Sequence, residues 1–145
     1  MERMKNKRFM TEEELNVLKK YTYDKEKFCN ELICEHALQR IKERNITTSL
    51  VTEVVGSKNY EIVEFRYFRK CVDGILKTDY RVLIKSRKEF FINGKWNKLC
   101  LSISLVTNYL ITAYWNYRGQ SHKQSANSIK NIVEVLENGK KQQII

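Results

Sequence analysis

A period of two in the hydrophobic pattern, interrupted by two turn dipeptides, constrains the fold of this chain more than any other feature. From residue 99 to residue 105, leucine or isoleucine occupies every odd position and cysteine or serine every even position, as in a β-strand with one buried face. Asp73-Gly74 and Asn93-Gly94 favour tight hairpin turns, because these residue types tolerate positive φ. The sequence therefore predicts about four antiparallel strands, at 60–69, 79–87, 98–106 and 109–117.

Helical patterns precede this region. Thr11 and Glu14 form a capping-box sequence, which predicts that a helix begins at Thr11. A second helix is expected over residues 25–43, with a break near 29–31 as the alternative. Thr47 or Thr48 should cap a short third helix that ends at Gly56.

A last helix is expected at 125–137, where apolar residues recur at helical spacing. Helices before a run of strands indicate an α+β fold. We therefore expect N-terminal helices (11–56) packed on a roughly four-stranded antiparallel sheet (60–117), with a C-terminal helix. The whole chain, 1–145, is expected to be one domain, with flexible ends at 1–10 and 139–145.

The positive charge of the chain is concentrated in the predicted sheet and in the residues just after it. The formal net charge is +10, and residues 66–130 hold 13 lysines and arginines but only three acids. Ten aromatic residues are interleaved with these charges. Basic and aromatic side chains together suit a nucleic-acid surface, through phosphate neutralisation and base stacking. The alternatives are a basic protein kept soluble by its charge and a surface for an acidic partner protein.

The four cysteines form no C-x-x-C pair, and neither histidine has zinc-finger spacing. We therefore expect reduced thiols, no metal site and no cofactor. No apolar run approaches the length of a membrane span, and the charged first 20 residues lack the apolar core of a signal peptide. These features predict action in the cytoplasm, with secretion or delivery into a neighbouring cell only by a route that needs no such signal.

A row of basic side chains is expected along one predicted helix, from Cys34 to Ile46. His36, Arg40 and Arg44 recur at four-residue steps beside an apolar stripe, so they should line the edge of the core. A histidine can move a proton near neutral pH and an arginine can bind phosphate through two hydrogen bonds. The alternative is a partly buried structural histidine with solvated arginines.

A second group of polar side chains should share the uncovered face of the sheet. Thr112, Tyr114 and Asn116 alternate on the last strand, with Ser102 and Ser104 on the strand beside it. The candidates on the other strands are Arg66, Arg81 and Lys85. The alternative is that threonine and tyrosine are simply common in strands.

Other chemistry is poorly represented in the sequence. It contains no glycine-rich phosphate loop, no H-E-x-x-H helix and no G-x-S-x-G elbow. Acid–base attack of a ribose 2′-OH on a phosphodiester needs no metal, only a base, an acid and cations near the phosphate.

The segment from His36 to Ile46, the basic strands and the Thr-x-Tyr element at Thr112 and Tyr114 resemble the small ribonuclease toxin domains of the barnase–EndoU–colicin–RelE superfamily. The likeness is strongest to the tips of contact-dependent inhibition and other polymorphic toxins, and it spans roughly residues 35–122. It implies a BECR-like fold with His36 as the acid–base residue. Thr112 and Tyr114 would lie at the scissile phosphate, and Arg40 or Arg81 would stabilise charge.

The resemblance also implies the substrate and a partner. Such domains cut RNA, often tRNA, and are blocked by a cognate immunity protein, here expected to be small and acidic. We therefore expect a metal-independent endoribonuclease toxin, with catalytic residues His36, Arg40, Thr112 and Tyr114. The substrate-binding residues would be Arg44, Arg66, Arg81, Lys85 and Asn116. The alternatives are a nucleic-acid-binding module without activity and a basic protein that docks an acidic partner.

Overall fold

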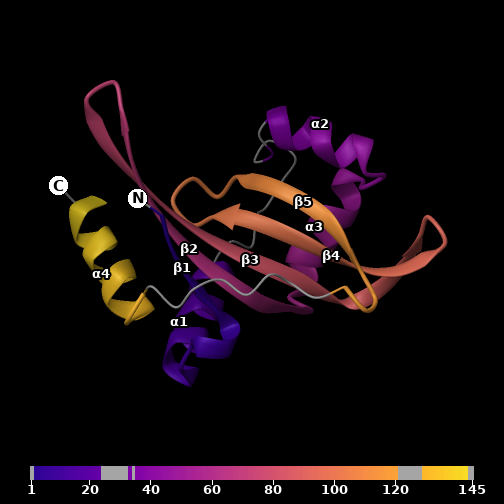
Figure 1. Cartoon of the computed structure of the whole chain (residues 1–145), viewed down its shortest axis with the longest axis horizontal. Coiled ribbons are helices and arrows are strands. Elements are labelled where there is room, and N and C mark those ends of the chain that lie inside the picture. Colours follow the sequence, from indigo (N-terminus) through magenta and orange to yellow (C-terminus); the bar gives the residue numbers. More distant parts are fainter. Residues whose placement is uncertain (1, 24–32, 34, 121–128, 144–145) are drawn as a thin grey trace.

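The computed structural model describes residues 2–23, 33, 35–120 and 129–143, and within them it confirms the α+β fold. Five antiparallel strands form one sheet in the order β1-β2-β3-β4-β5, and its long β2–β3 and β3–β4 hairpins project at opposite ends (Figure 1). The strands are β1 (Glu2–Asn6), β2 (Tyr60–Val72), β3 (Ile75–Ile92), β4 (Lys95–Ser104) and β5 (Leu110–Tyr117).

The two predicted hairpin turns are confirmed. Asp73 and Gly74 have φ of 53° and 76°, and Asn93 and Gly94 have φ of 52° and 77°. Positive φ at both central residues gives the turn a twist that matches the strands, so these dipeptides fix the register of both hairpins.

Strand β1 lies in the segment 1–10, for which the sequence predicted no strand or helix. Residues 2–6 pair with β2, from Glu2 opposite Phe68 to Asn6 opposite Glu64, and a 3₁₀ turn at Lys7–Phe9 comes next. The segment is too polar to show an apolar period, so only its pairing with a strand some 60 residues away defines it as a strand.

The described helices are α1 (Glu12–Tyr23), α2 (Glu35–Glu43), α3 (Thr48–Ser57) and α4 (Ile132–Gln143). The predicted capping box of α1 is present, since the Thr11 N–H donates to Glu14 and the Glu14 N–H donates to Thr11. Thr47 caps α3, as one of the two expected caps. Of the second predicted helix, residues 25–32 and 34 lie outside the described residues.

Helix α4 begins seven residues later than predicted and extends into the tail that was expected to be loose. Asn131 caps it: its Oδ1 accepts hydrogen bonds from the N–H groups of Val133 (2.9 Å) and Glu134 (3.4 Å). An asparagine cap is a strong helix start. Residues 125–128 of the predicted helix lie outside the described residues.

One face of the sheet packs against the helices. Leu18 of α1, Ala37 and Ile41 of α2, and Ile132 of α4 join a single core cluster with strand residues such as Phe65. Helices α2 and α3 lie together at one end of the sheet, and α1 and α4 lie at the other (Figure 1). This arrangement leaves the second face of the sheet to strand side chains.

A β-bulge at Val63 decides which side chains reach that second face. Ile62 pairs with Ile84, whereas Glu64 pairs with Leu83, so Val63 is an extra residue on β2. The extra residue lets both Ile62 and Phe65 face the core while Glu64 faces the opposite way. We call this second side the polar face; its residues include Glu61, Glu64, Arg66, Asp79, Arg81, Leu83, Lys85, Glu89, Phe91, Trp96, Lys98, Cys100, Ser102, Ser104, Thr112, Tyr114 and Asn116.

A buried ion pair connects the first strand to the first and last described helices. Lys5 Nζ lies 2.8 Å from Glu14 Oε2, and both side chains are almost fully buried. Lys5 also donates to the carbonyl of Lys130 (3.1 Å), and Glu14 accepts the N–H of Ile132 (2.9 Å). These bonds satisfy both charges inside the protein.

Candidate functional site

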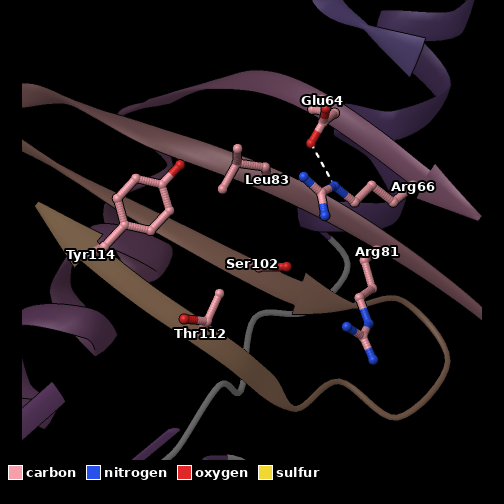
Figure 2. Close-up of a pocket in the computed structure, with 7 residues that line it drawn as sticks. All are labelled: Glu64, Arg66, Arg81, Leu83, Ser102, Thr112 and Tyr114. Atoms are coloured by element: carbon pink, nitrogen blue, oxygen red, sulfur yellow. Dashed lines mark hydrogen bonds and ion pairs between the residues drawn. The ribbon is translucent and has the colours of Figure 1, made fainter. Parts of the chain in front are cut away.

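A hollow of about 100 Å³ opens on the polar face and is lined by four neighbouring strands. Figure 2 shows its seven side chains on one side of the sheet. The register explains how they meet, because Arg66 pairs with Arg81, and Ser102 pairs with both Leu83 and Thr112. The lining residues are Glu64, Arg66, Arg81, Leu83, Ser102, Thr112 and Tyr114.

Each arginine of the hollow is held by a carboxylate two residues earlier on its own strand. Arg66 Nε donates to Glu64 Oε2 at 2.7 Å, and Arg81 Nε donates to Asp79 Oδ2 at 2.7 Å. A guanidinium carries five N–H donors, so one that holds a carboxylate through Nε can also contact a phosphate through its terminal nitrogens. The Arg66 guanidinium turns toward the centre of the hollow, and that of Arg81 lies at its rim (Figure 2).

Asp79 is itself fixed in place. Ser104 Oγ donates to its second oxygen, Oδ1, at 2.7 Å, and Ser104 accepts the backbone N–H groups of Val106 and Thr107. Arg81 also lies over the Phe68 ring, 4.6 Å from its centroid. The position of Arg81 is therefore set by a carboxylate, a ring and the turn after β4.

Tyr114 is a hydroxyl donor in the hollow. Burial, and then the charge and hydrogen bond of Cys100, raise the pKa of Tyr114, and the charge of Glu64 adds to this effect. Burial also raises the pKa of the Cys100 thiol to about 11. Both groups are therefore protonated at neutral pH, and the charges of Glu64 and Arg66 also act on the Tyr114 hydroxyl.

A second hollow of about 250 Å³ continues the polar face toward the β3–β4 turn. Lys85 and Lys98 contribute positive charge, and Arg118 forms two hydrogen bonds with Glu89, at 2.8 and 3.0 Å. These bonds from Arg118 lower the pKa of Glu89. The remaining lining residues are Asn116, Tyr117, Gly119 and Gln120.

The structure brings together six of the nine predicted site residues. Arg66, Arg81, Thr112 and Tyr114 line the first hollow, and Lys85 and Asn116 line the second. Lys85 lies 3.4 Å from Glu61, and Asn116 donates to Gln120.

The other three predicted residues lie on or beside α2 and line neither hollow. His36 and Arg40 are exposed, whereas the buried residues of their helix join the core beneath the opposite face. Arg44 has a structural contact, because its Nη1 donates to the carbonyl of Ala113 at 2.6 Å and its own carbonyl accepts from Trp115 Nε1. The catalytic role of His36 stays a prediction.

Glu64 and Arg118 are site residues that the sequence patterns did not single out. The alternation of β2 places Glu64 beside Arg66, and this spacing was the available signal for it. Arg118 lies beyond the last strand, so only its bonds to Glu89 bring it to the polar face.

Neither a metal centre nor a membrane span is found in the described part of the chain. Within it, no group of three or more histidine, cysteine, aspartate or glutamate side chains could hold a metal ion. None of the helices in the same residues is long and apolar enough to cross a membrane. Comparisons of the chain with protein-family models, with curated proteins and with solved structures find no match.

Proposed function

We propose that this protein binds RNA along its polar face and cleaves it at the first hollow without a metal ion. The observation that carries the proposal is the meeting of Arg66, Glu64 and Tyr114 in one small hollow. Together they supply a cation, a carboxylate and a protonated hydroxyl, which are the three kinds of group that metal-independent phosphodiester cleavage needs.

The reaction would use the 2′-OH of the substrate as its nucleophile. Arg66 and Arg81 hold the phosphate, and the Glu64 carboxylate accepts the 2′-OH proton as the oxygen attacks phosphorus. The bond from phosphorus to the 5′-oxygen breaks, and Tyr114 donates its proton to that oxygen. The products are a 2′,3′-cyclic phosphate and a 5′-OH. The raised pKa of Tyr114 keeps the phenol protonated at neutral pH, so it has a proton for the leaving 5′-oxygen, which is more basic still as an alkoxide.

Here Glu64 and Tyr114 transfer the protons, whereas the resemblance gives that role to His36. The two assignments predict opposite results in one assay. Purified protein is incubated with total RNA and with tRNA in EDTA, and initial rates are compared for Glu64→Gln, Tyr114→Phe and His36→Ala. If the hollow is the active site, the first two variants lose about 10²–10⁴-fold in rate while His36→Ala cuts like wild type.

The assay can separate the two assignments because neither substitution should unfold the protein. His36 is exposed, and Glu64→Gln nearly preserves the shape of the side chain. Thermal melts verify that each variant is folded, and the ends of the RNA products are analysed for cyclic phosphate. Cleavage lost in His36→Ala but retained in Glu64→Gln would move the chemistry to α2 and refute the assignment made here.

RNA binding without cleavage is the second candidate. The ion pairs of Arg66 with Glu64 and of Arg81 with Asp79 favour it, because arginine–carboxylate pairs are common at protein surfaces that have no catalytic role. Wild-type protein that binds RNA but cuts none of it would establish this alternative. A small acidic protein that blocks the polar face, as the resemblance implies, should compete with RNA in the same binding assay.

A further inference from the structure

Two aromatic rings are exposed at the end of the β3–β4 hairpin, away from the core. Phe91 is 60% exposed and Trp96 is 47% exposed, and the two residues are direct partners across the strands. Their ring centroids lie 5.3 Å apart, with the planes at 59°. Each ring supports the other, so both stay partly exposed at little cost in conformational entropy.

Two cations lie on the same side of the sheet as this pair. The Arg118 guanidinium lies 6.0 Å from the Trp96 ring centroid and is fixed there by Glu89. Lys98, the partner of Glu89 on β4, lies on the same face. An exposed ring beside an oriented guanidinium is suited to a flat, anionic ligand.

The pair lies on the same side of the sheet as both hollows. Trp96 and Ser102 are six residues apart on β4 and point to the same face, which places them roughly 20 Å apart. The second hollow lies between them and supplies Lys85 and Lys98. A nucleic-acid strand with a stacked rise of about 3.4 Å per nucleotide covers this distance with roughly six nucleotides, and a more extended strand needs fewer.

We propose that Phe91 and Trp96 stack a base of single-stranded RNA while a phosphate several nucleotides away lies in the first hollow. This inference rests on the proposed RNA binding and adds the strandedness of the substrate and a minimum length. A duplex hides the faces of its bases, so only an unpaired base can cover the rings.

The experiment measures binding of a fluorescent 2′-O-methyl oligouridine 12-mer, which lacks the free 2′-OH and cannot be cut by the proposed route. Trp96→Ala and Phe91→Ala should weaken binding by about 5–150-fold, the range expected for one stacked base. Trp96→Phe should restore most of the loss. Phe9→Ala is the matched control, because Phe9 is 39% exposed with the Arg8 guanidinium 5.6 Å away, yet lies outside the polar face.

At a stacked rise of about 3.4 Å a trinucleotide is too short to reach the rings and the first hollow together, so Trp96→Ala should cost it less affinity than it costs the 12-mer. A 12-base-pair duplex should bind wild type more weakly than the single strand and be insensitive to Trp96→Ala. Equal 12-mer affinity for Trp96→Ala, Phe9→Ala and wild type would overturn the inference, as would equal losses for the duplex and the single strand. The inference would also be overturned by two results together: the wild-type protein does not bind the 12-mer, and it forms a dimer in sedimentation that Trp96→Ala disrupts.

The cleavage proposal and the stacking inference can be tested independently of each other. Stacking with no cleavage of natural RNA supports the inference and refutes only the chemistry. Cleavage that depends on Glu64 but not on Trp96, with unchanged 12-mer binding in Trp96→Ala, refutes only the inference.

Discussion

Removing Glu14 should destabilise the protein more than removing any exposed charge, although Glu14 lies far from the polar face. Its carboxylate accepts two hydrogen bonds from Lys5 Nζ, at 2.9 and 2.8 Å, and one each from the N–H groups of Thr11 and Ile132. Only 3% of the residue is exposed. Glu14→Ala therefore leaves a buried ammonium without its counter-charge and two N–H groups without acceptors.

Breaking a buried pair in this way costs about 3–5 kcal/mol in the free energy of unfolding. For a chain of this length that corresponds to a fall in Tm of roughly 10 °C. Lys5→Met should cost less, about 2 kcal/mol, because the Glu14 carboxylate keeps its two backbone donors. The control is Lys7→Met, which breaks the exposed pair with Glu61 at 3.3 Å and should cost less than about 1 kcal/mol.

The pH dependence gives an independent measure of the same pair. Burial alone would raise the pKa of Glu14, but hydrogen bonds from Lys5, Thr11 and Ile132 outweigh it and hold the pKa below its ordinary value of 4.5. The unfolded chain therefore binds the proton more tightly. The stability due to this carboxylate is complete above about pH 4.5 and is lost as the pH falls through the lower folded pKa.

The assay is urea unfolding monitored by circular dichroism at several pH values between about 3 and 7, a range that spans the titration of the carboxylate. Glu14→Gln should lower stability at neutral pH and flatten the loss of stability on the acid side. The double variant Lys5→Met/Glu14→Gln should be less destabilised than the sum of the single variants. The reasoning is refuted if Glu14→Ala costs no more than Lys7→Met, or if Glu14→Gln keeps the wild-type acid dependence.

The polar face leads to three further predictions. The affinity for RNA should fall steeply with salt, with a log–log slope of about −0.7 for each phosphate contact on a single strand; a flat dependence in fluorescence anisotropy would argue against a nucleic-acid surface. RNA cleavage should continue in excess EDTA, and activity that EDTA abolishes and magnesium restores would contradict the proposed chemistry. Iodoacetamide at neutral pH should label the exposed Cys71 and spare the buried Cys100, because burial raises the pKa of the Cys100 thiol to about 11. Peptide mass spectrometry of the labelled folded protein measures both rates, and equally fast labelling would contradict the prediction by showing that the polar face opens readily.

Local sequence signals were sufficient for most of the fold. The Asp-Gly and Asn-Gly turns act within four residues, as do the caps at Thr11 and Thr47, so each could be predicted without knowledge of the rest of the chain. Strand β1 could not, because a short charged segment becomes a strand only through its pairing with β2. The start of α4 depended on a choice among several polar residues that could cap a helix, and Asn131 makes the capping bonds.

The candidate site was predictable where strand alternation alone decides it. Alternation places Thr112 and Tyr114 on one face, and antiparallel pairing brings Ser102 opposite Thr112. The position of His36 depends on how α2 is rotated and placed against the sheet, which no local pattern encodes. Alternation also puts Glu64 and Arg66 on one face of β2, whereas the bulge at Val63, which lets Ile62 and Phe65 both face the core, has no such local signal.

The contact of Arg44 with β5 bears on how the sheet avoids pairing with strands of other molecules. An edge strand offers a row of backbone hydrogen-bonding groups to any other strand, and long exposed edges promote aggregation. On β5 the Ala113 carbonyl is occupied by the Arg44 guanidinium, and Leu110 forms a parallel bridge with Ile33. Helix α2 and the residues beside it therefore cover part of this edge, and Arg44 occupies a backbone acceptor with which a strand of another molecule could otherwise pair.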